Sequence, residues 1–480
     1  MNAQSASLNS PAARLAFQSY AGIGVLVFLL MMLAGALMRM THGKWIDLPP
    51  NVFYQIMTLH GAGMVGTAGL AGAAVMWYFL RKYVNLSTGI FVAMLLLSLV
   101  GVVMILVAIG VGGFAGAWTF LYPLPAKSMG LWSNHAAAGY IGGLVFIGVG
   151  FLLFYLDCAV AIIKRFGSLV KGLGLDQLMS GRIDSSHPPT VVASTMVVII
   201  NTLGILAGAV VLVISLINLY APGFAPDALL MKNLIFFFGH VFINATIYMA
   251  VIGVYEIVPA YTGRPWKVSR PFLAAWAVVT LVVLAVYPHH ILMDFVMPKW
   301  AAMLGQVLSY VSGIPVLLVT TWGLLANLHH SGVKWELPLR LLVFGVLGWS
   351  IGVIPAIVDA TIRVNLVMHN TQWVPGHFHL YLLLGLLPML LGTLIYATTR
   401  DNWRESSVDH VMFWIYGVAG LVFCMMFLAG GVQGTPRRFA EHAVEWLPYS
   451  KIGAASALLV VIAALHLGGK VIRRLPHAIL

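Results

Sequence analysis

Six histidines in strongly apolar stretches are the residues of this sequence best suited to chemistry: His60, His240, His289, His290, His377 and His379. A histidine inside a bilayer is costly to bury and usually serves a function. Imidazole nitrogens also bind transition metals such as iron, copper and zinc. A single buried histidine can equally well hydrogen-bond to a neighbouring helix. Six of them, with one adjacent pair and one pair two residues apart, predict metal centres instead.

The surrounding sequence is that of a polytopic membrane protein. Its 480 residues are 61% hydrophobic and only 8% charged, whereas a soluble domain carries about 25% charged residues. Apolar stretches of about 20 residues are long enough to cross a bilayer as helices. We expect an all-α protein whose residues 1–480 form a single transmembrane catalytic domain. Its twelve predicted helices are 19–40, 53–80, 88–111, 137–164, 190–219, 229–260, 272–294, 301–327, 340–367, 376–399, 411–430 and 449–470.

The distribution of basic residues predicts how these helices are oriented. The formal net charge is +12, but lysines and arginines are scattered over loops rather than clustered, so no nucleic-acid binding is expected. Roughly two thirds of them fall on the side that carries both termini, and the positive-inside rule assigns that side to the cytoplasm. We therefore expect a multi-pass protein of a bacterial inner (plasma) membrane with both termini inside.

This orientation places all six histidines at one depth. At 1.5 Å per residue along each predicted helix, they fall in the outer, periplasmic part of the membrane. Nothing in the composition requires this agreement, whereas one layer of metal centres would produce it. A secondary transporter also has about twelve helices, but it is expected to bind its substrate near the midplane and to show matching halves. No internal repeat is visible in this sequence.

The motifs that carry the histidines resemble subunit I of the haem–copper oxidases. The resemblance extends from the second predicted helix to the loop before the twelfth. It rests on WVPGHFH at 373–379, on the adjacent histidines at 289–290 and on GHVFIN at 239–244. The runs HNTQW at 369–373 and HILMD at 290–294 look like those of the B-type members. The resemblance implies the subunit I fold, an oxidoreductase activity, two haems and one further metal ion.

Two of the implied sites are haems. By family pattern, His60 and His379 are the axial ligands of a low-spin haem, expected to be haem b, and this closed ligation suits electron transfer. His377 is the single protein ligand of a high-spin haem of b or a type, which keeps an open position for chemistry. Residues two apart on a helix point about 200° apart, so one helix can serve both haems. A two-haem electron conduit without catalysis would need only His60 and His379.

The third implied site is a non-haem metal held by His240, His289 and His290. Three imidazoles without a carboxylate suit copper better than iron. The NO reductases of this superfamily that depend on cytochrome c use iron there, with glutamate beside the histidines. No glutamate stands at position 244. The resemblance therefore implies one copper ion.

A polar loop at 434–438 resembles the Pro-Arg-Arg motif that holds haem propionates. The adjacent guanidiniums of Arg437 and Arg438 can make charge-assisted contacts to carboxylates. An ordinary basic loop is the alternative. His369 is expected to contact the same propionates or line the pocket, with a plain loop histidine as the alternative.

Asn244 is the residue that separates two possible reactions. In the oxygen-reducing members a tyrosine stands four residues after the helix-six histidine, is joined covalently to it, and supplies the fourth electron that dioxygen requires. Asparagine cannot do this, and Tyr248 lies too deep for the cross-link. In another branch the tyrosine comes from helix seven, where this chain has Val282 and Val283.

Coupling two NO molecules to N2O and water takes two electrons and no tyrosine, and an asparagine can donate a hydrogen bond to a bound NO oxygen. The chain thus resembles the sNOR-type nitric oxide reductases. The alternative is a terminal oxygen reductase in which Asn244 merely bonds to a neighbouring group.

Protons must also reach this buried site. Candidates for a route from the cytoplasmic side are Tyr255, Glu256, Ser309, Tyr310 and Ser312, which resemble the family's K-type channel in location only. Hydroxyls that bond to backbone carbonyls are the alternative explanation in membrane helices.

The sequence also predicts partners. It has no C-x-x-C-H motif, so no covalent haem c is expected on this chain, and its two cysteines lie far apart in sequence. By family resemblance, electrons arrive through a subunit II with a periplasmic cupredoxin-like or haem c domain, from a cytochrome c or a cupredoxin. Membrane lipid surrounds the helices, and NO or O2 is the small-molecule substrate.

Overall fold

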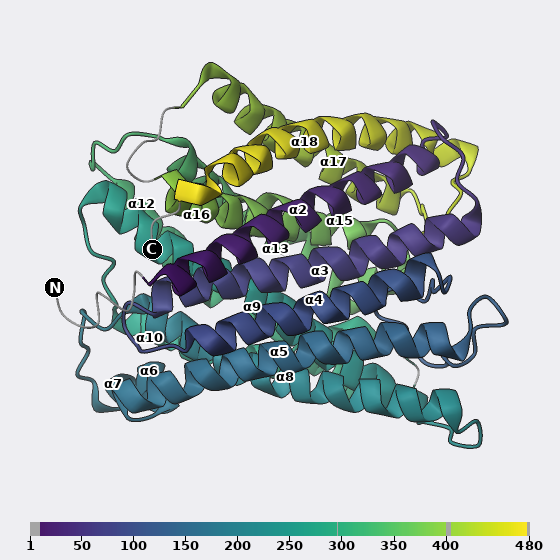
Figure 1. Cartoon of the computed structure of the whole chain (residues 1–480), viewed down its shortest axis with the longest axis horizontal. Helices are drawn as coiled ribbons and strands as arrows, with labels where there is room; N and C mark the ends of the chain where they lie inside the picture. Colours follow the sequence, from purple (N-terminus) through teal and green to yellow (C-terminus); the bar gives the residue numbers. More distant parts are fainter. Residues whose placement is uncertain (1–9, 295, 400–404, 478–480) are drawn as a thin grey trace.

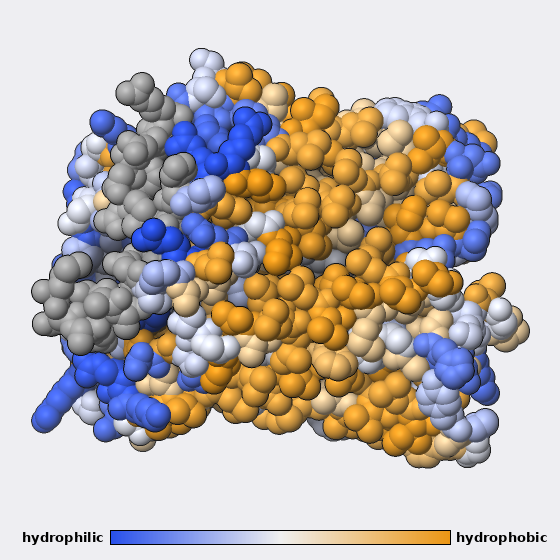
Figure 2. All heavy atoms as spheres, in the orientation of Figure 1, coloured by the Kyte–Doolittle hydropathy of each residue, from blue (hydrophilic) through white to orange (hydrophobic). Residues whose placement is uncertain are grey.

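The chain folds into a bundle of long antiparallel helices in the computed structural model, which describes residues 10–294, 296–399 and 405–477. Within these residues, twelve helical spans are long and apolar enough to cross a membrane, which confirms the predicted number. On the face seen in Figure 2, apolar side chains cover the middle of the bundle and polar side chains gather at its two ends. This is the surface of a multi-pass membrane protein.

The spans in chain order are α2 (Pro11–His42), α3 (Pro50–Leu80), α4 (Thr88–Gly110), α5 (Asn134–Phe166), α8 (Pro189–Tyr220), α9 (Ala228–Thr262), α10 with η1 (Arg270–Ala285 and Tyr287–Ile291), α11 with α12 (Lys299–Val311 and Ile314–Leu328), α13 (Leu337–Asp359), α15 with η2 and α16 (Trp373–His379, Leu380–Leu386 and Leu387–Thr399), α17 (Ser407–Val432) and α18 (Leu447–Arg474). Short helices connect them: α6 (Leu169–Gly172), α7 (Leu175–Ser180), α14 (Ile362–Met368), η3 (Val444–Trp446) and η4 (Leu475–His477). Figure 1 shows the long helices running side by side.

Four predicted helices are interrupted, and a single continuous helix was the wrong prediction for each. The helix predicted at 272–294 ends at Ala285 and gives way to the 3-10 turn η1, where Pro288 lacks the backbone N–H that a continued α-helix would use. The helix predicted at 301–327 breaks between α11 and α12, just before Pro315. The one predicted at 340–367 ends at Asp359, whose carbonyl accepts from Nδ2 of Asn365 at 2.8 Å.

The fourth interruption follows the histidine-rich motif directly. The helix predicted at 376–399 begins earlier, at Trp373, and turns into the π-helix η2 immediately after His379. Single π-helical turns inside α-helices often mark functional sites. This span is also the most enclosed of the twelve, because 78% of its most apolar stretch is buried inside the protein.

The two ends of the bundle can be distinguished by their residues. The side-chain Nε2 of Gln18 donates to the carbonyl of Leu475 at 2.7 Å, so the beginning of α2 and the end of α18 meet at one end, the terminal end. The other end, where α2 ends at His42 and α3 begins at Pro50, is called the histidine end. The terminal residues 1–9 and 478–480 lie outside the described residues.

The six histidines lie at one level of the bundle. His60 lies ten residues inside α3 and His240 twelve inside α9, which is about 15–18 Å from the histidine end. The ring centroids of His240 and His289 are 5.0 Å apart, and those of His60 and His379 are 6.4 Å apart. His290 adjoins His289 in η1, and His377 shares the short helix α15 with His379. All six therefore occupy one layer.

Candidate metal and haem centre

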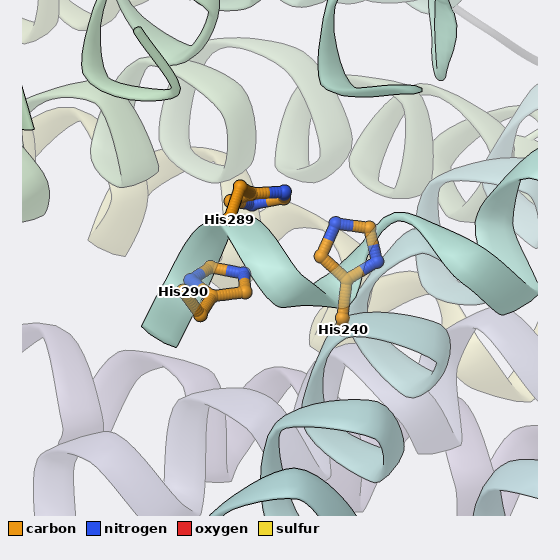
Figure 3. A group of neighbouring side chains, drawn as sticks. All are labelled: His240, His289 and His290. Atoms are coloured by element: carbon orange, nitrogen blue, oxygen red, sulfur yellow. The ribbon is translucent and has the colours of Figure 1, made fainter. Parts of the chain in front are cut away.

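His240, His289 and His290 form one compact cluster, the histidine trio. Their rings turn toward a common space, as Figure 3 shows, and one nitrogen from each lies within 4.8 Å of the others. The ring centroids of His240 are 5.0 Å from His289 and 5.3 Å from His290. Three nitrogens this close can bind one metal ion with bonds of about 2 Å after small adjustments.

Contacts behind the trio fix the orientation and the tautomer of the His289 ring. Its Nδ1 lies 2.8 Å from the carbonyl of Val286 and 2.7 Å from Oγ of Ser309. Ser309 in turn donates to the carbonyl of Gly305 at 2.6 Å. These acceptors keep a proton on Nδ1 and leave the lone pair of Nε2 free for a metal. The close approach of α11 to η1 requires Gly305, because a Cβ there would lie 3.0 Å from the backbone nitrogen of His289.

Asn244 lies against the same cluster, one turn below His240. Its Nδ2 donates to the His240 carbonyl at 2.8 Å and lies 3.0 Å from ring Nδ1 and 3.5 Å from Nε2. The amide therefore approaches the edge of the imidazole that carries both nitrogens. One amide hydrogen serves the carbonyl, and the second is within reach of the His240 ring nitrogens.

His60 and His379 form a second, separate arrangement. Their rings are nearly parallel, 13° apart, with centroids separated by 6.4 Å. Nδ1 of His60 lies 2.7 Å from the carbonyl of Met31, and Nδ1 of His379 lies 2.7 Å from that of Pro375. Two metal–imidazole bonds of about 2 Å, plus roughly 1 Å from each nitrogen to its ring centre, account for such a separation. The pair fits a low-spin haem iron between its two Nε2 atoms.

A glycine, a phenylalanine and an arginine pack around the His60–His379 pair. A Cβ on Gly35 would lie 2.7 Å from Cε1 of His60, so α2 passes directly behind that ring. On the other side, His379 stacks on Phe427 at 5.1 Å, and the guanidinium of Arg39 lies 4.2 Å from the centre of the same phenylalanine. Arg39 donates to Oε1 of Gln372 at 2.8 Å.

Within the described residues, the ring nitrogens of His377 have no hydrogen-bond partner. Its buried Nδ1 makes no hydrogen bond to any described residue, and its Nε2 lies 3.9 Å from Oδ2 of Asp359, which is beyond hydrogen-bond reach. Buried ring nitrogens without partners are rare in folded proteins. This residue fits a single ligand to a haem iron, on the far side of α15 from His379.

A cavity of about 220 Å³ lies between His289 and His290 of the trio and the polar loop at 434–438. Its lining includes Leu121, Lys232, Phe236, His289, His290, Met293, Asp294, Asp359, His369, Asn370, Val374, Arg437 and Arg438. Three cations and two carboxylates line it, and one of those carboxylates, Asp294, is paired with Lys232 at 2.7 Å. The excess of positive charge fits an anionic group such as a haem propionate.

The loop arginines and His369 line this cavity. The backbone N–H of Arg437 donates to the carbonyl of Asn370 at 2.9 Å, and Arg438 adopts a left-handed φ of +67°. Burial and the neighbouring Arg438 lower the pKa of Arg437 to about 10, so it stays charged at neutral pH. Burial and the nearby Arg437 and Lys232 lower the pKa of His369 to about 4, so its ring is neutral there.

The predicted proton-route residues do not form one line. Tyr255 Oη shares a 2.7 Å hydrogen bond with Oγ1 of Thr320 on α12. Glu256 turns away to the terminal end and accepts from Lys82 at 2.9 Å and Tyr83 at 2.8 Å. Ser309 contacts the trio itself. The remaining two make local contacts, Tyr310 to Thr361 at 2.8 Å and Ser312 to the carbonyl of Ser309 at 3.3 Å.

Sequence reasoning missed two residues of the centre, Asp359 and Trp118. Asp359 ends α13 and lines the cavity, and a lone acid at the end of an apolar helix was its only signal. A Cβ on Gly61 would lie 2.7 Å from Cδ1 of Trp118, and one on Gly239 would lie 3.7 Å from its Cη2. The indole thus reaches from the neighbour of His60 to the neighbour of His240. It comes from an irregular loop, where no helical periodicity could place it.

Comparisons with known proteins bear on the family of this chain. The chain is 28% identical to cytochrome c oxidase subunit 1 of Thermus thermophilus over 236 residues, which are 44% of this chain and 41% of that protein. It is 23% identical to the heme-copper oxidase subunit I+III of Aeropyrum pernix over 241 residues, 49% of this chain and 29% of that protein. The matched region thus spans less than half of either relative.

The fold and the sequence profile extend the likeness to nearly the whole chain. A heme-copper terminal oxidase solved as a dimer by cryo-electron microscopy has the same fold, with a TM-score of 0.79 at 19% identity, over 98% of this chain and 85% of that one. The profile of the family described as cytochrome c and quinol oxidase polypeptide I matches residues 16–463. The chain therefore belongs to this family, subunit I of the haem–copper oxidases, whose members are oxidoreductases that bind haem and copper.

Proposed function

We propose that this chain is the catalytic subunit of a nitric oxide reductase, which converts two NO molecules to N2O and water. The observation that carries the proposal is the position of Asn244. Its amide nitrogen lies 3.0 Å from Nδ1 of His240, where the oxygen-reducing members of the family carry their cross-linked tyrosine. An asparagine supplies no electron there, and the coupling of two NO molecules needs none from the protein.

The residues would hold three redox groups. His60 and His379 are the proposed ligands of the low-spin haem and His377 that of the high-spin haem. The trio of His240, His289 and His290 would hold copper. When bound, these groups supply the two electrons and the site where the N–O substrate binds.

The remaining side chains orient the ligands and the substrate. The amide nitrogen of Asn244 lies 3.0 Å from Nδ1 of His240, and it would donate to an NO oxygen beside the trio once that ring is bound to the metal. Such a donor, fixed before the reaction, stabilises charge that develops on oxygen. Ser309 and Val286 hold the tautomer of His289. Arg437, Arg438 and His369 would hold the propionates at the histidine end.

A terminal oxygen reductase is the second candidate, and the relatives favour it. The matched Thermus thermophilus protein is named a cytochrome c oxidase subunit, and the matched structure is named a terminal oxidase. In that case Asn244 would leave the site without its usual electron donor, and oxygen chemistry would need another source for the fourth electron.

The orientation and partners complete the proposal. The histidine end would face the periplasm of a bacterial inner membrane, and the terminal end would face the cytoplasm, in accordance with the excess of basic residues there. Electrons would come from a cytochrome c or cupredoxin through a subunit II docked at the histidine end. Residues 1–480 would act as one transmembrane catalytic domain.

The product identifies the reaction. The purified, reduced complex is supplied under argon with nitrogen-15-labelled NO, and the released gas is analysed by mass spectrometry. We expect one doubly labelled N2O for every two NO molecules consumed, at a rate that depends on the electron donor. NO that binds or disappears without a matching release of N2O would contradict the proposal.

A further inference from the structure

The π-turn η2 begins at the residue after His379 and joins α15, which carries both proposed haem ligands, to α16. A π-turn closes its hydrogen bonds between residues five apart, so it holds one residue more than an α-turn. One extra residue rotates the segment before the turn by about 100° relative to the segment after it. The turn therefore sets the direction in which His377 and His379 face relative to α16.

The π-turn leaves the backbone carbonyl of Leu383 without its usual donor. In an α-helix this carbonyl would accept from the N–H of Leu387, but here that N–H donates to the carbonyl of Leu382. The next backbone nitrogen belongs to Pro388, which carries no hydrogen. A buried carbonyl without a donor is destabilising and rare in folded proteins. The turn thus needs a donor from another element.

Tyr416 on α17 supplies that donor. Its hydroxyl donates to the carbonyl of Leu383 at 2.6 Å, and its side chain is fully buried. Phe423 and Phe427 follow two and three turns further along the same face of α17. Both of their rings contact His379, with centroids 5.4 and 5.1 Å away. One face of α17 therefore supports both the haem ligand and the turn that follows it.

Glycines on α13 leave room for the backbone of the turn. A Cβ on Gly348 would collide with the carbonyl oxygen of Leu384, and one on Gly352 would lie 2.9 Å from the backbone nitrogen of Tyr381. The backbone of the π-turn thus packs directly against that of α13. This packing fixes where the turn lies, whereas the hydroxyl of Tyr416 fixes its hydrogen-bond register.

We propose that Tyr416 is a positioning residue for the haem ligands. Its hydrogen bond to Leu383 holds the π-turn in register and thereby sets the orientation of His379 opposite His60, an inference that rests on the haem ligation given with the proposed function. Without the hydroxyl, the Leu383 carbonyl regains a donor only if the N–H of Leu387 returns to it, as in an α-turn. That change would turn the His379 ring out of its alignment with His60, which is within 13° of parallel.

Tyr416→Phe tests this role, because it removes one oxygen and keeps the ring. The readout is the electron paramagnetic resonance spectrum of the oxidised holoenzyme complex. The g values of a haem with two histidine ligands report the angle between the two imidazole planes. We expect the largest g value of the low-spin haem to rise, because the planes depart from parallel. Wild-type g values in Tyr416→Phe would overturn the proposal.

Tyr20→Phe is the matched control. Tyr20 is also buried, and its hydroxyl donates to a helix carbonyl, that of Phe91, at 2.8 Å. This bond joins α2 to α4, and Tyr20 lies about 22 Å along α2 from Gly35, the residue behind His60. We expect wild-type g values in this variant. An equal shift in both variants would show that the spectrum follows a general loss of packing, and the role of Tyr416 would be refuted.

A second change covers the case in which Tyr416→Phe loses its low-spin haem. Pro388→Ala restores an N–H five residues after Leu383, which is the spacing of a π-turn. In the double variant Tyr416→Phe/Pro388→Ala we therefore expect the wild-type g values to return. A double variant that still lacks the haem, or that keeps the shift, would contradict the proposal.

The same measurements separate this inference from the proposed reaction. A wild type that consumes O2 but not NO would contradict the NO reductase alone, because the low-spin spectrum is recorded without either substrate. A wild type whose spectrum shows no haem with two histidine ligands would overturn the ligation by His60 and His379 and the role of Tyr416 together.

Discussion

The two histidine arrangements of this protein use the same side chain for opposite purposes. His60 and His379 face each other as parallel rings, and a haem between them would be closed on both faces. The trio instead gathers its nitrogens around a common space, with Asn244 beside His240. Whether a metal held by one of these imidazoles can react depends on what occupies its opposite coordination position. A haem iron with a second histidine ligand can only transfer electrons, whereas a metal with an open position can bind a substrate.

Removing one ligand from the open arrangement should have the largest effect. In His240→Ala we expect the copper to be lost and turnover to fall by about a thousandfold or more, since a catalytic metal contributes several kcal/mol. Metal analysis and NO turnover measure this. The low-spin haem spectrum should be unchanged. A variant that keeps both its copper and its activity would show that His240 is not a ligand of the copper.

Removing one ligand from the closed arrangement should separate the two regions. His60→Ala should abolish the low-spin haem spectrum and turnover with a protein electron donor. Dithionite-reduced enzyme should still bind NO at the high-spin haem, because that site is built from other residues. Loss of the high-spin spectrum instead of the low-spin one would show that the assignment of the two haems is reversed.

Asn244→Leu sharpens the comparison at the edge of the trio. It keeps the size of the side chain but removes the amide hydrogen that would donate to the substrate. We expect NO turnover to fall about a hundredfold, the cost of losing one fixed donor at a developing charge. Asn244→Gln, which retains the amide, should recover part of the rate. Wild-type turnover in Asn244→Leu would show that the amide serves only the helix.

Ser309→Ala should act on the metal through His289. The hydroxyl lies 2.7 Å from Nδ1 of that histidine, and losing such a supporting contact typically costs 10–100-fold in metal affinity. Copper titration of the depleted enzyme measures it. Ser312→Ala is the control, because its hydroxyl reaches only the carbonyl of Ser309. Equal copper affinities in the two variants would contradict this account of His289.

Gly35→Ala is expected to have the smallest effect, confined to the closed arrangement. The new methyl group would lie 2.7 Å from Cε1 of His60, so the ring must tilt and the low-spin absorption band should shift. Gly24→Ala on the same helix is the control, since a Cβ there would meet nothing within 4 Å. Identical low-spin spectra for both variants would show that helix α2 shifts to make room for the methyl group and that the His60 ring does not tilt.

The sequence was sufficient for the spans and for the layer of histidines, because both follow from apolar length and helical rise. It was not sufficient for the breaks. Pro288 and Pro315 marked two of them, but the π-turn after His379 has no composition of its own. The support of His289 by Ser309 depends on how closely α11 approaches η1. That distance is set by packing at Gly305, which no single-sequence pattern reveals.

The most direct test of the central claim is the ratio of NO turnover to O2 turnover, measured on one preparation of the complex with one electron donor. If Asn244 marks an NO reductase, NO turnover should be fast and oxygen uptake slow. Fast oxygen uptake with slow NO turnover would show that the site completes oxygen reduction without the tyrosine, and the second candidate function would replace the first.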